Sequence, residues 1–243
     1  MRKPSIALSL EGLPIIGLCA LLTLALALLG WTFLAFVSFV LTALVVNFFR
    51  DPERVVPAEP GLAVAPADGV VVKVGPAVDP ATGEERTVVC IFMNVFNVHV
   101  NRSPVDAEVT GVVYHEGAFI NASLDKASED NERNEVRLCD AEGQAWNVIQ
   151  IAGLIARRIV CWAEPGDTLD RGRRLGLIKF GSRLDTYLPP TYLPAVSEGQ
   201  KTAAGQTVIA RRAPEAEKKA PVRKKAAAKK APGNKAAAKG DKA

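Results

Sequence analysis

The sequence has few of the residues that build disulfide frameworks, metal centres and hydrolase active sites. Its 243 residues include only 4 Cys and 2 His. No two cysteines form a Cys-x-x-Cys pair, and the Gly-x-Ser-x-Gly elbow of serine hydrolases is missing. We therefore expect free thiols in a reducing compartment and no metal site, and we exclude an ordinary serine hydrolase.

Charged residues are absent from residues 13–49. A single membrane-spanning helix needs about 20 apolar residues, and this stretch is nearly twice as long. Gly30 and Trp31 lie at its middle, where a tight turn would divide it into two short helices. Basic residues flank both ends, which favours two cytoplasmic ends and hence a helical hairpin. One long tilted span and a re-entrant or monotopic segment are the alternatives.

The C-terminal residues 211–243 contain no aromatic side chain and only one aliphatic side chain larger than alanine. They include 12 basic and 3 acidic residues, a charge of +9, whereas the rest of the chain carries −5. Such a segment buries too little apolar surface to fold alone, so we predict a disordered basic tail. Attraction to anionic lipid, or no specific role, is favoured over nucleic acid binding because the apolar N-terminus already commits the chain to a membrane.

Between these two segments, short β-branched runs alternate with glycine and proline. The runs that are typical of strands are residues 69–75, 87–92, 109–114, 146–151 and 159–162. Strands at this density predict a mainly β fold, an antiparallel sandwich or barrel-type domain. We therefore expect a membrane-associated segment at 1–49, a catalytic domain at 50–210 and the tail at 211–243.

Two further patterns lie within the predicted domain. Residues 164–175 and 197–208 form a weak repeat, each with two glycines six residues apart. Glycine at turns explains this repeat without any functional role, so we interpret it as architecture. Residues 121–134 are polar and are the main candidate for a helix or an ordered loop.

Three residues could build an activated nucleophile. Ser182 follows an apolar strand pattern, His99 alternates with valines on a β segment, and Asp68 lies in a glycine turn. A serine, a histidine and an aspartate are the ingredients of such a site. Each also has an ordinary structural reading, because Gly-Ser and Asp-Gly pairs are common in turns and a lone histidine is often a core residue.

Six segments, spread over roughly residues 47 to 210, carry a more specific signal when taken together. They are Asn47–Pro52, Ala65–Gly69, Phe92–Pro104, Tyr114–Asn121, Ser128–Arg133 and Lys179–Arg183. In content and order they resemble the short form of the phosphatidylserine decarboxylase proenzymes, a family of pyruvoyl-dependent enzymes. The Phe-Gly-Ser-Arg part of the last segment is the strongest match, and the basic tail lies outside the resemblance.

The resemblance implies that the chain cuts itself between Gly181 and Ser182. Ser182 Oγ would attack the Gly181 carbonyl carbon to give an ester, and β-elimination would then release a β chain of residues 1–181. The dehydroalanine left at position 182 would hydrolyse to a pyruvoyl group and ammonia, at the start of an α chain of residues 182–243. In this scheme His99 deprotonates Ser182, and Asp68 orients the imidazole.

The same resemblance implies decarboxylation of phosphatidylserine to phosphatidylethanolamine. The pyruvoyl carbonyl would form a Schiff base with the serine amine and act as the electron sink when carbon dioxide leaves. We expect the enzyme at the cytoplasmic face of the cell membrane, in contact with membrane lipid, with its β and α chains associated and a homo-oligomer possible. The alternatives are a decarboxylase of another serine phospholipid, such as an ether lipid, and a non-enzymatic membrane-anchored β-barrel carrier or binding module.

Other polar residues have roles that the motifs define less closely. We expect His115 and Arg133 to lie near the substrate. Residues 131–133 form either an ion-pair network near the site or a solvated face of a helix. The long form of the family carries a second histidine three residues before the relay histidine, and this chain has Phe96 there. A proton donor assigned to that histidine cannot be carried over, so His99 serves twice or another group returns the proton.

Overall fold

The computed structural model describes residues 7–120, 130–153, 158–179 and 181–214. A helix or ordered loop was expected at residues 121–134; of these, 121–129 lie outside the described residues, as does most of the predicted tail, and a strand already begins at Arg133. All four cysteines, which the structure does describe, are free thiols.

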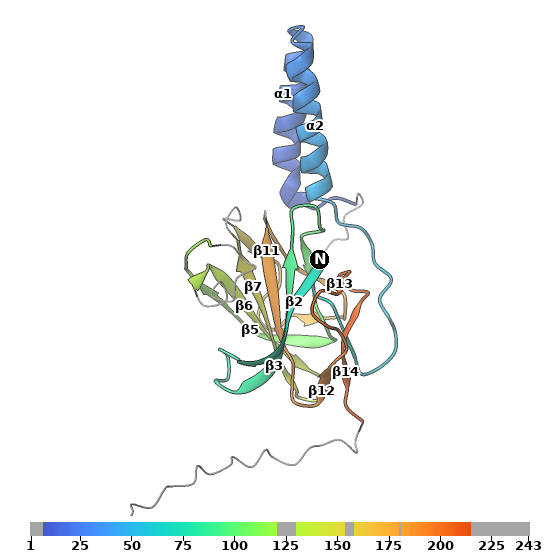
Figure 1. Cartoon of the computed structure of the whole chain (residues 1–243), viewed down its shortest axis with the longest axis vertical. Helices are drawn as coiled ribbons and strands as arrows, with labels where there is room; N and C mark the ends of the chain where they lie inside the picture. Colours follow the sequence, from blue (N-terminus) through green and yellow to red (C-terminus); the bar gives the residue numbers. More distant parts are fainter. Residues whose placement is uncertain (1–6, 121–129, 154–157, 180, 215–243) are drawn as a thin grey trace, which may run out of the picture. The chain divides into compact units, whose positions relative to one another are not determined.

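The apolar N-terminal residues form two antiparallel helices that lie side by side (Figure 1). A short 3₁₀ turn, η1 (Leu10–Gly12), leads into α1 (Leu13–Leu28), and α2 (Thr32–Phe48) follows a tight turn in which Gly30 has a φ of 73°. No residue of α1 is buried, and residues Leu10–Leu28 are long and apolar enough to cross a membrane. Thr23 Oγ1 lies 2.8 Å from Ser38 Oγ, and such hydrogen bonds join helices where lipid offers no partner.

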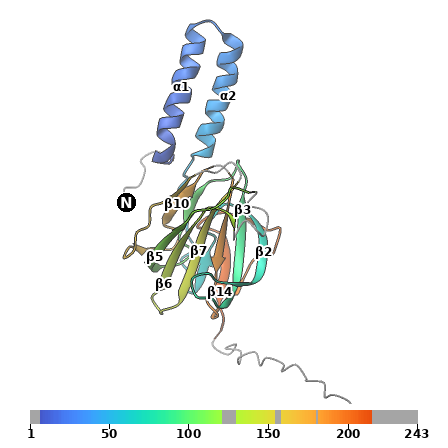
Figure 2. The ribbon, with the colours of Figure 1, turned by 90° about the vertical axis from the view of Figure 1, so that its left-hand side faces the viewer.

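The remaining described residues form a β domain, which we define as the strands β1 to β14 and their connections (Figures 1 and 2). The strands are β1 (Leu62–Val64), β2 (Gly69–Val78), β3 (Glu85–Met93), β4 (Val100–Arg102), β5 (Ala107–His115), β6 (Arg133–Asp140), β7 (Ala145–Ala152), β8 (Ile159–Cys161), β9 (Thr168–Leu169), β10 (Arg174–Ile178), β11 (Ser182–Tyr187), β12 (Tyr192–Pro194), β13 (Lys201–Thr202) and β14 (Val208–Arg212). Every pairing between these strands is antiparallel.

One large sheet has the strand order β13-β2-β3-β11-β7-β6-β5-β9, and two three-stranded sheets, β1-β14-β12 and β4-β10-β8, accompany it. The prediction of a mainly β, antiparallel domain behind apolar helices is confirmed, and all five predicted strands are present. Strand β14 runs to Arg212, two residues past the predicted domain boundary, because the Arg212 N–H donates to the Gly61 carbonyl at 2.8 Å.

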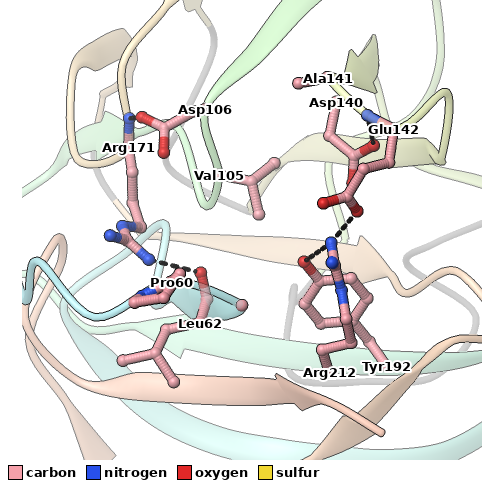
Figure 3. A pocket seen from close by; sticks show the side chains of 11 residues that line it. Pro60, Leu62, Val105, Asp106, Asp140, Ala141, Glu142, Arg171, Tyr192 and Arg212 are labelled. Atoms are coloured by element: carbon pink, nitrogen blue, oxygen red, sulfur yellow. Dashed lines mark hydrogen bonds and ion pairs between the residues drawn. The ribbon is translucent and has the colours of Figure 1, made fainter. Parts of the chain in front are cut away.

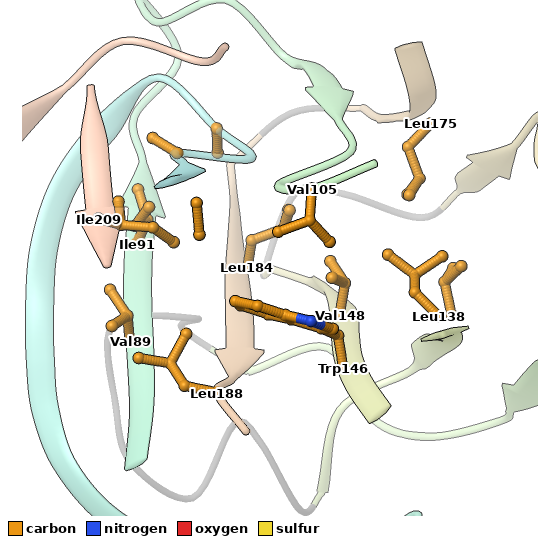
Figure 4. Packing of buried hydrophobic residues seen from close by; sticks show 14 of the residues in the cluster. Val89, Ile91, Val105, Leu138, Trp146, Val148, Leu175, Leu184, Leu188 and Ile209 are labelled. Atoms are coloured by element: carbon orange, nitrogen blue, oxygen red, sulfur yellow. The ribbon is translucent and has the colours of Figure 1, made fainter. Parts of the chain in front are cut away.

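Alternation along the strands divides the buried apolar side chains between the two faces of the large sheet, and Figure 4 shows part of the larger cluster. Trp146, Val148 and Leu184 lie at the middle of this core and are almost completely buried. The Trp146 ring meets the ring of Tyr192 edge-on, with centroids 4.6 Å apart, and its indole N–H donates to Asp140 Oδ2. A buried tryptophan thus keeps its polar atom satisfied while it fills the centre of the domain.

The weak repeat forms two matching turns. All four of its glycines have positive φ, between 73° and 91°, and its two copies contain the edge strands β9 and β13. In the first copy the Arg171 N–H donates to Asp106 Oδ1, and in the second the Ala204 N–H donates to Asp68 Oδ1, both at 2.7 Å. Asp68 and Asp106 are therefore equivalent residues, each capping one glycine turn beside the start of a long strand.

Candidate active site

Ser182 begins β11, the strand at the centre of the large sheet. It pairs with Met93 of β3 on one side and Ala152 of β7 on the other, and it is completely buried. Its Oγ lies 3.9 Å from Met93 Sδ, a weak acceptor that competes little for the hydroxyl proton. The serine is thus held in place by backbone pairing while its side chain keeps a replaceable partner.

Gly181 precedes this serine with a φ of 72°, in the left-handed region. A Cβ at this position would meet no atom within 4 Å, so the backbone conformation, rather than crowding, favours glycine here. Because glycine has no side chain, residue 181 itself does not cover the carbonyl carbon that Ser182 Oγ would attack in the predicted cleavage.

Arg183 anchors the start of β11 from the opposite face of the sheet. Its Nε donates to Asp185 Oδ1 at 2.6 Å and its Nη2 donates to Asp185 Oδ2 at 3.0 Å, and both residues are buried. A buried, bidentate ion pair between alternate residues stiffens the strand on which Ser182 lies.

His99 lies completely buried just before β4, and its carbonyl accepts the Ile178 N–H at 3.4 Å. Its Nδ1 lies 3.0 Å from the Asn97 carbonyl oxygen. Because a carbonyl oxygen only accepts, Nδ1 carries the proton and Nε2 presents its lone pair. Among the described residues Nε2 has no hydrogen-bond partner.

The ring of Phe48, the last residue of α2, covers this imidazole. The two ring centroids are 4.1 Å apart at an interplanar angle of 33°. Burial lowers the pKa of His99 from its ordinary value of 6.5 to about 4, the Asn97 carbonyl opposes this shift, and the positive charge of Arg50 adds to it. His99 is therefore neutral at physiological pH, and within the described ranges the lone pair on its Nε2 has no hydrogen-bond donor.

A chain of buried amides, which the sequence did not reveal, leads to Ser182. Asn134 Nδ2 donates to Gln150 Oε1 at 3.0 Å, and Gln150 Nε2 donates to Asn101 Oδ1 at 2.9 Å. Asn101 Nδ2 then donates to Met93 Sδ at 3.7 Å, the same sulfur atom that Ser182 Oγ approaches. Because each acceptor fixes the orientation of the next amide, a strong N–H donor is aimed at the neighbourhood of Ser182.

Asp68 has partners other than His99 in this structure. Its carboxylate pairs with Arg54 Nη2 at 2.8 Å and caps the Ala204 N–H. In the described part of the chain no hydrogen bond joins Asp68, His99 and Ser182 directly. The structure links Ser182 to Asn101 of β4, the strand that follows His99, through their shared neighbour Met93 Sδ, and the relay through His99 and Asp68 stays a prediction.

His115 and Arg133 lie opposite each other on β5 and β6. Across the large sheet Arg133 pairs with Ile151, whose other neighbour is Arg183, so both residues share the end of the sheet at which Ser182 lies. His115 Nε2 is 3.4 Å from Glu135 Oε2. Asn131 is buried, and its amide donates to the Ala152 carbonyl at 2.6 Å, so it does not lie on a solvated helix face.

A cavity of about 200 Å³ lies at the other end of the domain (Figure 3). Arg212 in its wall pairs with Glu142 and donates to the Tyr192 hydroxyl, while the Arg171 guanidinium donates to the Leu62 carbonyl. Arg212 and Glu142 thus neutralise each other, and none of the predicted site residues lines the cavity. Within the described residues, no three His, Cys, Asp or Glu side chains form a group that could hold a metal ion.

Comparison with known proteins gives consistent matches. The family model for phosphatidylserine decarboxylase matches residues 41–210, from within α2 to within β14. A Solidesulfovibrio magneticus protein named phosphatidylserine decarboxylase proenzyme is 63% identical, over 88% of this chain and 100% of that protein. Proteins of the same name from Nitratidesulfovibrio vulgaris and Ruegeria pomeroyi are 59% and 49% identical, over 88% and 82% of this chain and 99% and 93% of their own lengths.

Proposed function

Because the chain belongs to the phosphatidylserine decarboxylase family, we propose that it converts phosphatidylserine to phosphatidylethanolamine with a pyruvoyl group made from its own Ser182. The observation that carries the proposal is the buried start of β11, where a left-handed Gly181 precedes a serine held between two strands. Self-cleavage after Gly181 would turn this serine into the first residue of the smaller chain.

His99 is the proposed base for this cleavage. Its Nε2 lone pair would take the proton of Ser182 Oγ as that oxygen attacks the Gly181 carbonyl. A pKa of about 4 keeps the imidazole unprotonated and ready to accept this proton. We include Asp68 as the acid of the relay because of its place in the motif Ala65–Gly69. Its contacts in the structure are with Arg54 and Ala204 and do not themselves support this role.

Asn101 is the proposed hydrogen-bond donor. Its amide orientation is set by Gln150, so an N–H is available for the negative charge that develops on the Gly181 carbonyl oxygen. The fit of a pyruvoyl group rests on the same observations, made on the described residues: His99 Nε2 has no partner, the Asn101 amide is a fixed donor, and Ser182 Oγ approaches a sulfur atom. The pyruvoyl carbonyl supplies the electron sink that no side chain provides.

The apolar hairpin supports a membrane location. Its exposed side chains are largely Leu, Phe and Val, and surfaces of this kind avoid water. Both ends of the hairpin return to the same side, because Leu8 forms a β-bridge with Arg50. With the flanking basic residues this favours the cytoplasmic face of the cell membrane, where the serine headgroup is within reach.

The two chains would remain together after cleavage. Strand β11, which would open the α chain, forms six residue pairs with β3 and six with β7, both of which belong to the β chain. A homo-oligomer is compatible with this arrangement.

A carrier or binding module is the weaker alternative. A carrier presents a modifiable lysine at an exposed hairpin tip, and Lys179 is the nearest candidate to the predicted cut. Its side chain is only 15% exposed and lies 3.9 Å from Glu11. The structure therefore offers nothing at this position for a modifying enzyme to reach.

Purified protein on a denaturing gel tests the proposal. We expect fragments of 181 and 62 residues from the 243-residue chain, the smaller one blocked at its N-terminus. Ser182→Ala should leave one uncut chain that releases no carbon dioxide from phosphatidylserine. Ser103→Ala is the matched control, because Ser103 is equally buried and its hydroxyl donates to the Val105 carbonyl, away from Gly181. A folded, membrane-bound wild-type chain that stays intact would refute self-cleavage.

Substrate choice is tested separately. Carbon dioxide release is compared for ester-linked and ether-linked phosphatidylserine, presented in the same vesicles. Faster turnover of the ether lipid would mean that the substrate is an ether-linked serine phospholipid. The proposed self-cleavage would not be affected by this result.

A further inference from the structure

The connection between β3 and β4 contains a rigid turn at residues 94–97. Asn97 Oδ1 accepts the Asn94 N–H, and Asn94 Oδ1 accepts the Phe96 N–H, each at 2.9 Å. The Asn97 N–H donates to the Asn94 carbonyl at 3.0 Å. These three bonds close the turn, so the side chains at its tip cannot retract into the core without breaking it.

That tip is apolar. Val95 and Phe96 are 41% and 66% exposed. Among the described residues that follow the hairpin, they are the one pair of consecutive large apolar side chains that are both exposed. A closed turn with two apolar side chains at its tip presents a small water-avoiding surface that the β domain itself leaves uncovered.

The turn is tied to the base of the hairpin. Arg50 Nη2 donates to the Phe96 carbonyl at 2.7 Å, and its Nη1 donates to the Asn47 carbonyl of α2 at 2.6 Å. Val98, just after the turn, is buried in the same apolar cluster as Phe48. The turn is therefore held at the level at which α2 leaves the apolar hairpin.

Positive charge accompanies this position. The Arg50 guanidinium lies beside the turn, and the Lys179 ammonium lies 6.0 Å from the ring centre of Phe49 at the end of α2. Apolar side chains flanked by basic groups are the composition that enters the boundary between acyl chains and anionic headgroups.

We propose that Val95 and Phe96 form a wedge that enters the lipid surface beside the hairpin and holds the Ser182 end of the domain at the level of the headgroups. Met93, which immediately precedes the turn, is the direct strand partner of Ser182. The wedge would thus hold the end of the domain that contains the buried Ser182 at the lipid surface, as a second contact beside the hairpin. The catalytic consequence rests on the proposed function, and the contact with lipid does not.

The contact is tested by fluorescence quenching of the full chain in phosphatidylcholine vesicles that contain brominated lipid. Phe96→Trp should add emission that the bromine atoms quench, relative to the wild-type background. Val78→Trp is the matched control: Val78 is 63% exposed but lies at the opposite end of β2 and β3, so its added emission should not be quenched. Unquenched added emission from Phe96→Trp, as when a second copy of the chain covers the turn, would overturn the proposal.

The consequence is tested with Val95→Ser/Phe96→Ser, which keeps both asparagines of the turn. Self-cleavage should be unchanged, and the apparent KM for phosphatidylserine in vesicles should rise about tenfold with kcat retained, since two apolar side chains lose their lipid contact. A short-chain phosphatidylserine below its micelle concentration should be turned over as by the wild type. Equal KM values in vesicles would contradict the wedge. The two proposals can fail separately. If the emission added by Phe96→Trp is quenched but the wild-type chain releases no carbon dioxide, the proposed function is refuted and the wedge is supported.

Discussion

Two aspartates open matching strands in this domain, and they differ in their surroundings. Asp68 precedes β2 and Asp106 precedes β5, and each caps a glycine turn with a bond of 2.7 Å. Asp68 lies at the end of the large sheet where Ser182 begins β11, whereas Asp106 lines the cavity at the other end. The shared cap shows that a motif aspartate can have a purely architectural role, so position alone does not make Asp68 catalytic.

The two ends also differ in the kind of polar group that they hold. At the cavity, Arg212 forms an ion pair with Glu142 and the Arg171 guanidinium donates to the Leu62 carbonyl, while Arg171 Nε has no partner among the described residues. At the other end, His99 Nε2 has no partner in the described part of the chain, and the Asn101 amide N–H donates to a sulfur atom. A neutral imidazole can accept a proton whereas a guanidinium cannot, so the type of unsatisfied group, rather than its presence, distinguishes the two ends.

The largest expected effect tests the two aspartates directly. Asp68→Asn should slow self-cleavage by about 1000-fold, as expected when the acid of a relay is removed. Asp106→Asn removes the equivalent turn cap and should leave the rate within a few-fold of the wild type. Cleavage is followed on denaturing gels after synthesis, and thermal unfolding is measured for both uncut chains. Equal rates in the two variants would reduce Asp68 to a turn cap.

The next effect tests the amide donor. Asn101→Leu should slow cleavage by about 100-fold, the loss typical of one donor to a developing oxyanion. Asn147→Leu is the matched control, because Asn147 is also a buried amide but donates to Asp79 at the other end of β7. Comparable slowing in both variants, with comparable loss of stability, would make the amide chain structural only.

A third prediction concerns pH. The folded pKa of His99 is lower than the unfolded value, so its contribution to stability is complete above about 6.5 and is lost as pH falls toward 4. Because a pKa of about 4 leaves the imidazole unprotonated at pH 5.5, self-cleavage should keep its full rate at that pH. Phe48→Ala admits water to the imidazole and returns the pKa toward 6.5, so cleavage at pH 5.5 should fall about tenfold. Phe49→Leu is the control, since it alters the same cluster and leaves the Phe48 ring over His99.

The smallest effect belongs to the cavity. Arg212→Gln removes the ion pair between Arg212 and Glu142. The side chain of Arg212 is 39% exposed and that of Glu142 is 50% exposed. Exposed pairs contribute less than about 1 kcal/mol, so urea unfolding should shift only slightly and cleavage should not change. A large loss of cleavage would mean that the two ends of the domain are coupled.

Much of the fold was predictable from local patterns. Alternation of β-branched residues located strands such as Val109–Tyr114, and the absence of charge together with Gly30 indicated two apolar helices. The Gly181-Ser182 pair was recognisable because its motif is contiguous. These features depend on neighbours in the sequence, which is why a pattern suffices to find them.

The remaining site features depend on strand register and on packing between distant segments. Asn101, Gln150 and Asn134 lie on three different strands, and each alone is an ordinary polar residue in a strand. They meet only because the three-stranded sheet β4-β10-β8 packs against β6 and β7 of the large sheet. The contact between Phe48 and His99 likewise depends on how the hairpin meets the domain, which no local pattern encodes.

The central place of β11 has a consequence for the lifetime of the enzyme. The precursor forms the pairs of β11 with β3 and β7 within one continuous chain. If the chain is cut after Gly181, the middle strand of the sheet belongs to a separate chain, and refolding would require two fragments to find each other. Unfolding of the mature protein would then be one-way in practice. Its working life would be set by how slowly β11 leaves the sheet, rather than by an equilibrium between folded and unfolded forms.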